Sequence, residues 1–141
     1  MSGSVTDRRH VFAELARDED VQFIVGDYMS EYNMTMRGGS KVQNPLEAAY
    51  EPCFLESIRP ALPHLAQNKI QVAVNAGGSD TKRLCEDLTA IIRAEGLDLK
   101  VAYVEGDEVI SAVEKAIEQG DNMRNLTTGM KLDTPIVVTQ R

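Results

Sequence analysis

Short apolar runs, each ending in glycine with acidic or amide residues, are the feature that most constrains how this chain folds. The three clearest junctions lie at residues 21–27, 70–78 and 99–107. Valine, isoleucine and other apolar residues make up most of each run, as is typical of strands buried in a parallel sheet. Helical patterns separate the runs, and this alternation predicts parallel strands joined by crossover helices.

The segments between the runs supply the helices and define the fold class. Helices are expected at residues 6–17, with Thr6 as cap, and at 46–58, 60–67, 80–95 and 108–119, and a fourth strand at 135–138. We therefore predict a single α/β domain over residues 1–141. Its mainly parallel sheet would carry helices on both faces, a three-layer, Rossmann-like arrangement. Residues 28–36 are expected to form a short helix, and Arg37-Gly38-Gly39-Ser40 a loop.

The charge and composition exclude several classes of partner. The formal net charge is −7 at pH 7 and the chain contains no tryptophan. Binding to nucleic acid or to anionic lipid needs a basic surface, so neither is expected. No apolar run is long enough to span a membrane, and the first residues lack the apolar core of a signal peptide. A cytoplasmic protein with a small-molecule or protein partner is the expectation.

Cysteine and histidine do not form a recognisable catalytic pattern. Cys53 and Cys85 fall within predicted helices and are expected to be buried thiols in a reducing compartment. His10 and His64 are expected at or near the surface. No nucleophile elbow is present that would indicate a serine hydrolase.

The strand ends are where chemistry is expected. Ligands of open α/β sheets bind outside the carboxyl ends of the strands, so Asp27, Asn75, Glu105 and Asp107 should converge. The Gly77-Gly78 pair precedes a helix, whose free N–H groups could hold a phosphate, a carboxylate or an enolate oxygen. The alternative is a tight turn capped by Ser79 or Asp80, because every strand-to-helix junction needs such a turn.

Acidic residues are the candidates for acid and base. We assign catalytic roles to Asp27, Glu31, Glu105 and Asp107, because two carboxylates in one cleft can differ in pKa. Asp107 is equally a candidate helix cap. A metal site is not predicted, since no histidine joins these residues at a recognisable spacing.

Polar and glycine residues around the same edge are the candidates for substrate binding. Arg37 could pair with an anionic substrate, or remain a solvated loop arginine. No cofactor is predicted, because the glycine pair belongs to neither a phosphate-binding P-loop nor a dinucleotide fingerprint. The assigned residues are Tyr28, Asn33, Arg37, Asn75, Gly77 and Gly78.

Three stretches, residues 23–31, 69–78 and 97–107, resemble the acyclic terpene utilisation (AtuA-like) family in order and spacing. The run 32–35 with Arg37-Gly38-Gly39 is similar to fungal members. The resemblance implies small-molecule metabolism, since the bacterial namesake is associated with acyclic terpenoid catabolism through acyl-CoA intermediates. It does not imply a particular reaction.

The sequence also departs from the family pattern. Members begin with a strand running into a Gly-Ser-Gly turn, whereas Ser2-Gly3-Ser4 already stands at the start here, and members continue well beyond residue 141. We therefore expect a shortened version of the N-terminal region. A sheet without that strand would expose an edge, which favours a homodimer or larger assembly.

Two functions remain open on this evidence. The first is a cofactor-independent lyase, isomerase or cyclase acting on a terpenoid- or polyketide-like substrate in secondary metabolism, with Gly77 and Gly78 stabilising a developing oxyanion. The second is a non-catalytic domain that binds an acyl-CoA-like ligand or a partner subunit.

Overall fold

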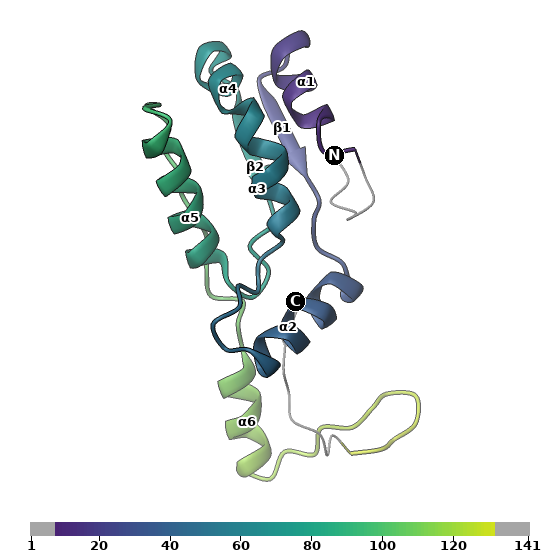
Figure 1. Ribbon diagram of the computed structural model, residues 1–141. Helices are drawn as coiled ribbons and strands as arrows, with labels where there is room; N and C mark the ends of the chain where they lie inside the picture. The colour runs from purple at the N-terminus through teal and green to yellow at the C-terminus, as the bar shows by residue number, and fades with distance from the viewer. Residues whose placement is uncertain (1–7, 132–141) are drawn as a thin grey trace.

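The computed structural model describes residues 8–131 and contains two parallel strands with helices around them (Figure 1). The strands pair in register from Phe23 opposite Gln71 to Gly26 opposite Val74. The predicted α/β class is therefore confirmed. The elements are α1 (Val11–Asp18), β1 (Phe23–Gly26), α2 (Glu31–Gln43), α3 (Pro52–Ile58), the 3₁₀ turn η1 (Arg59–Ala61), α4 (Leu62–Asn68), β2 (Gln71–Val74), α5 (Thr81–Ala94) and α6 (Ile110–Glu118).

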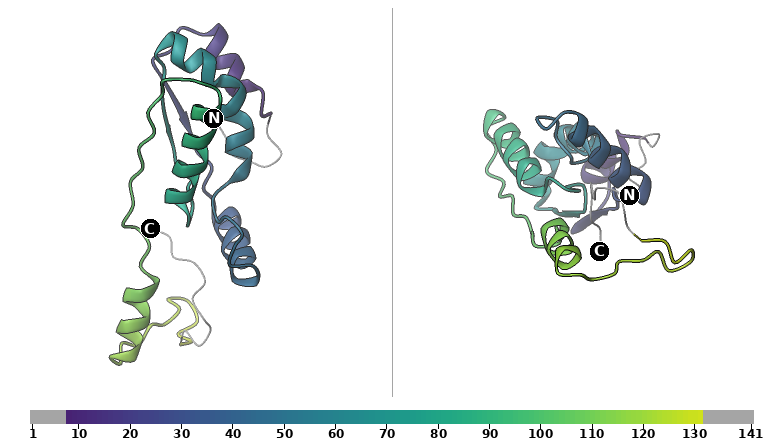
Figure 2. Two further views of the ribbon diagram at one scale, coloured as in Figure 1. Left: turned by 60° about the vertical axis from the view of Figure 1, so that its left-hand side comes forward. Right: turned by 90° about the horizontal axis from the view of Figure 1, so that it is seen from below.

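The core lies between one face of the sheet and helices α1, α3, α4 and α5 (Figure 2). Phe54 is at its centre, with its ring edge-on to Phe12 at 6.3 Å and to Tyr28 at 5.3 Å between centroids. Ile24 enters from β1, and Leu88 from α5. Over residues 8–131, no helix has both the length and the apolar character needed to cross a bilayer.

The opposite face of the sheet is exposed. Phe23 and Val25 point away from the core and are 61% and 64% exposed. Helix α6, which lies within the helix expected at residues 108–119, has no buried residue. The described residues thus form helical cover on one face only, and the predicted third layer is not among them.

The predicted strand at residues 99–104 is wrong, because the structure has no strand there. Leu97, Leu99 and Val101 alternate as a strand would and pack partly buried against the core. Val104 is 89% exposed, so the chain leaves the core before the expected strand ends. The strand at 135–138 and the Thr6 cap lie outside the described residues.

Residues 31–43 form helix α2, so the loop predicted at Arg37-Gly38-Gly39-Ser40 is also wrong. Ser30 caps the helix by accepting a hydrogen bond from the Asn33 N–H at 3.1 Å. Met34 and Gly38 are buried on its inner side. The helix thus continues through Gly38 despite the low helix propensity of glycine.

The two cysteines differ in environment. Cys53 in α3 is buried as predicted, whereas Cys85 in α5 is only half-buried. Burial, reinforced by hydrogen bonding to Glu51, raises the pKa of Cys53 to about 12.

We expect a thiol reagent at pH 8 to modify Cys85 well before Cys53 in the folded protein, because the thiolate is the reactive form and Cys53 is buried and protonated. Timed alkylation followed by peptide mass spectrometry measures this order. Denatured protein is the control, in which the two thiols should react at equal rates. Equal rates in the native protein as well would contradict the placement of Cys53.

Candidate functional site

The ends of β1 and β2 are tied together by the side chain of Asn75. Its Nδ2 donates to Asp27 Oδ1 at 2.8 Å, and its Oδ1 accepts from the Tyr28 N–H at 2.7 Å. Of the four residues expected to converge at this edge, the structure joins Asp27 and Asn75, whereas Glu105 and Asp107 line a cleft that includes neither of them. Because both partners are at strand ends, this amide fixes the edge of the sheet and leaves the Asp27 carboxylate in solvent.

Tyr28 and Asn33 support the segment that follows β1. The Tyr28 ring is buried in the core at 3% exposure, so it does not face the strand-end surface as a substrate contact would. Asn33 donates from Nδ2 to the Tyr28 carbonyl at 2.8 Å. Both residues thus hold the turn between β1 and α2.

The Gly77-Gly78 turn is closely packed on both sides. A Cβ on Gly77 would lie 2.5 Å from Thr81 Oγ1, and one on Gly78 would lie 2.6 Å from the Ala49 carbonyl oxygen. Gly78 also has a φ of +53°, which disfavours other residues. The turn therefore brings the start of α5 against the chain around Ala49.

Helix α5 begins without a side-chain cap. Asp80 occupies the N-cap position, but its side chain makes no capping hydrogen bond, so its predicted capping role is wrong. The carboxylate instead accepts from the Ala49 N–H at 3.3 Å and pairs with Lys41 Nζ at 3.4 Å. The first turn of α5, at the positive end of the helix dipole, therefore receives no acceptor from the side chain of its N-cap residue.

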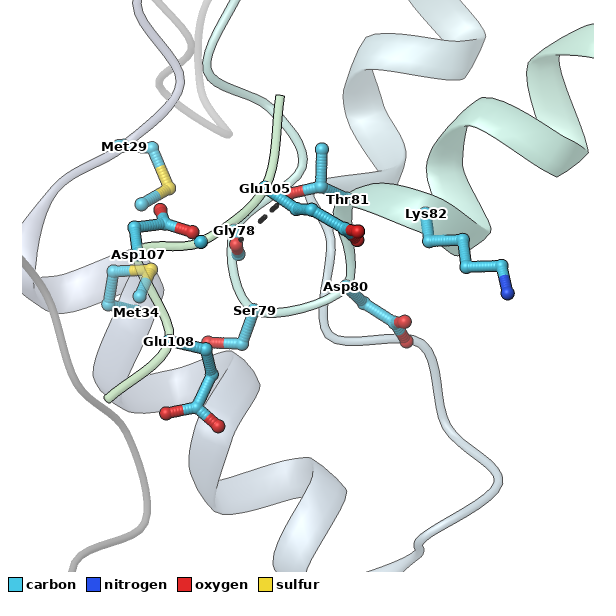
Figure 3. A pocket seen from close by; sticks show the side chains of 11 residues that line it. Met29, Met34, Gly78, Ser79, Asp80, Thr81, Lys82, Glu105, Asp107 and Glu108 are labelled. Atoms are coloured by element: carbon cyan, nitrogen blue, oxygen red, sulfur yellow. Dashed lines mark hydrogen bonds between the residues drawn. The ribbon is translucent and has the colours of Figure 1, made fainter. Parts of the chain in front are cut away.

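A half-open cleft of about 360 Å³ lies at this end of α5 (Figure 3). One side is the turn from Gly78 to Lys82, and the other is the segment 105–108, which crosses in front of it. Met29 and Met34 add an apolar wall next to Asp107. The lining residues are Met29, Met34, Gly78, Ser79, Asp80, Thr81, Lys82, Glu105, Gly106, Asp107 and Glu108.

The structure thus brings Gly78, Glu105 and Asp107 together, as expected, and adds residues that were not selected from the sequence. Lys82 and Glu108 belong to the lining. In the sequence, only the position of Lys82 near the Gly77-Gly78 turn and of Glu108 next to Asp107 could have indicated that they belong to the site.

The charge of the cleft is acidic. Asp80, Glu105, Asp107 and Glu108 line it, against the single cation Lys82. Glu108 Oε1 accepts from the Ile110 N–H at 2.6 Å, at the start of α6. Among residues 8–131, no three His, Cys, Asp or Glu side chains are grouped to hold a metal ion.

Of the predicted site residues, only Gly78, Glu105 and Asp107 line the cleft. The other seven do not: Asp27, Tyr28, Asn75 and Gly77 lie at the strand ends and their turns, and Glu31, Asn33 and Arg37 lie in α2. Glu31 is exposed in the first turn of α2 and does not line the cleft. Arg37 Nη2 lies 3.2 Å from Glu51 Oε1, and Glu51 is only 4% exposed. Arg37 therefore neutralises a buried carboxylate between α2 and α3 instead of lying in a solvated loop. Glu51 itself gave no sequence signal, since it precedes Pro52 as an ordinary helix-start residue.

The fold and the site together define an α/β domain with an acidic cleft at the carboxyl ends of parallel strands. The chain belongs to the acyclic terpene utilisation family: the family model described as acyclic terpene utilisation family protein AtuA matches residues 1–139. The resemblance carried by the three strand-end stretches is thereby confirmed. Comparison with curated proteins and comparison with solved structures each gave no match.

Proposed function

We propose that this protein is a cofactor-independent enzyme of terpenoid metabolism, of the lyase, isomerase or cyclase type, acting in the cytoplasm. The observation that carries the proposal is the cleft itself, in which carboxylates face the uncapped start of α5 beside two methionines. Family membership supports the substrate class.

The chemistry that fits this arrangement is proton abstraction next to a carbonyl group. Glu105 or Asp107 takes the C–H proton, and the bonding electron pair moves onto the carbonyl oxygen as an enolate. N–H groups of the first α5 turn, at Thr81 and Lys82, stabilise that negative charge. Return of the proton at another carbon completes an isomerisation. Met29 and Met34 pack against the hydrocarbon chain, because methionine adapts to irregular apolar surfaces.

The proposed substrate is uncharged. A phosphate or carboxylate entering the cleft would meet the carboxylates of Glu105, Asp107 and Glu108. Repulsion between like charges in a partly enclosed site disfavours such a ligand. The same argument weakens the alternative of an acyl-CoA-binding domain, because that ligand carries several phosphates.

The test is deuterium exchange from D₂O into the carbon next to the carbonyl, followed by NMR over a panel of acyclic terpenoid aldehydes and ketones. We expect Glu105→Gln or Asp107→Asn to lower the exchange rate by about 10²- to 10⁴-fold, the usual contribution of a general base. Glu31→Gln is the matched control outside the cleft and should retain the wild-type rate. Asp27→Asn should have a small effect, because Asp27 is not itself a lining residue; its Oδ1 accepts from Asn75 Nδ2 at 2.8 Å and from the Met29 N–H at 3.4 Å.

Exchange that persists in both cleft variants would contradict this assignment of the base. Absence of exchange with every compound of the panel would contradict the proposed proton abstraction and favour the non-catalytic alternative.

A further inference from the structure

The Asp80 carboxylate lies beside the first turn of α5 without capping it. Asp80 is the N-cap residue, and aspartate is among the most favourable residues there, because its carboxylate can accept from the N–H groups of the first turn. Its ψ of 45° is nevertheless outside the extended range usual for an N-cap, and Figure 3 shows its side chain directed away from Asp107. The helix dipole would also stabilise a capping carboxylate, so its position elsewhere needs a physical cause.

Two groups hold the Asp80 carboxylate in its position. Lys41 Nζ, from the last turn of α2, lies 3.4 Å from Asp80 Oδ2, and the Ala49 N–H donates to the same oxygen at 3.3 Å. The two side chains of the ion pair are 40% and 19% exposed, so solvent screens their attraction only in part. Of the two partners Lys41 carries the charge, and it therefore supplies most of the attraction that Asp80 would lose by turning to cap α5.

We propose that Lys41 is a positioning residue of the cleft: it keeps the Asp80 carboxylate off the first turn of α5 and leaves the N–H groups of that turn to the substrate oxygen. This inference rests on the proposed function, in which those N–H groups stabilise an enolate. Without the Lys41 charge, Asp80 turns to cap the helix. Its carboxylate then accepts from the same donors and repels the negative charge that develops on the substrate.

The ion pair also joins the two sides of the cleft. Lys41 belongs to α2, whose Met34 lines one side, and Asp80 belongs to the turn that lines the other. A second contact holds α2 independently, since Arg37 Nη2 lies 3.2 Å from the buried carboxylate of Glu51. Removing the Lys41 charge is therefore expected to release Asp80 while α2 keeps its place.

Amide hydrogen exchange at Lys82 and Arg83 tests the proposal without any substrate, because these are the second and third residues of α5, whose N–H groups an N-cap side chain contacts. In Lys41→Met, exchange at these two amides should slow by about fivefold, the factor of one capping hydrogen bond. Lys41→Arg keeps the charge and should match the wild type. The double variant Lys41→Met/Asp80→Ala should show no slowing. Loss of stability accelerates exchange and cannot imitate the expected result, so equal or faster exchange in Lys41→Met would overturn the proposal.

Deuterium exchange into the substrate supplies the functional readout. Lys41→Met should lower the rate at saturating substrate by at least about tenfold, because oxyanion donors are lost, but should have no further effect in an Asp80→Ala background. Lys115→Met removes a lysine charge from α6, outside the cleft lining, and should keep the wild-type rate. No loss, or an equal loss in both backgrounds, would overturn the positioning role. Absence of substrate exchange in the wild type would contradict the proposed function alone, since the amide measurement still shows whether Lys41 controls Asp80.

Discussion

Replacing Arg37 with alanine is expected to lower the free energy of unfolding by about 3 kcal/mol, because it leaves the Glu51 carboxylate buried without its cation. Glu51 is 4% exposed and lies 3.2 Å from the guanidinium. Urea denaturation followed by circular dichroism measures the change. Arg59→Ala is the matched control: its 2.9 Å pair with Glu95 is shorter but more exposed, at 63% for Arg59 and 26% for Glu95, and its loss should change stability by only about 0.5 kcal/mol.

The double variant Arg37→Met/Glu51→Gln separates a structural role of Arg37 from a role in substrate binding. Removing both charges should recover at least about 1 kcal/mol relative to Arg37→Ala, since a buried pair is often replaceable by neutral groups. If Arg37→Ala left stability unchanged but abolished substrate binding, the assignment of Arg37 to the fold would be wrong.

Gly78→Ala is expected to destabilise the protein by about 3 kcal/mol, the sum of a left-handed backbone conformation and a close approach. The added methyl would lie 2.6 Å from the Ala49 carbonyl oxygen, which is backbone and can yield only if the turn moves. Thermal unfolding monitors the loss.

Gly96→Ala isolates the conformational part of that effect. Gly96 has a φ of +69°, yet nothing lies within 4 Å of an added Cβ. Its substitution should therefore destabilise by about 1 kcal/mol. Equal effects at the two positions would show that the contact with Ala49 contributes nothing.

The sequence predicted the parts of the fold that are determined locally. Both β1 and β2 fall within the predicted runs, and α5 lies close to its predicted bounds, because apolar periodicity and flanking glycines are strong signals. The short helix expected at residues 28–36 is present as the first half of α2. Its continuation to Gln43 was missed since Gly38-Gly39 suggests a break, whereas burial of Met34 and the Ser30 cap stabilise the helix. Tertiary contacts override propensity in this way.

The strand predicted at residues 99–104 shows that sequence composition does not determine strand pairing. Residues 99–104 have a strand-like composition, but a strand also needs a paired neighbour, and pairing depends on the whole arrangement. The alternation survives only as the half-buried side chains of Leu97, Leu99 and Val101. This departure from the sheet is what carries Glu105 and Asp107 across the start of α5.

The sequence predicted the kinds of residue in the site better than which individual residues belong to it. Parallel strands put their carboxyl ends at one edge, so the pairing of Asp27 with Asn75 followed from topology. The pairing of Arg37 with Glu51 joins residues of different helices, and only packing reveals it. The methionine wall of the cleft likewise depends on where α2 lies, which no periodicity in the sequence specifies.

The core cluster has a consequence for biosynthesis. Among the described residues, its buried members extend from Phe12 to Ile92, and the last residue packed against it is Val101. All of these core side chains are therefore synthesised before α6. Because domains fold as units from the N-terminal side during synthesis, this core needs no side chain of α6 for its assembly. The cleft segment 105–108 likewise lies across a core to which it contributes no buried side chain.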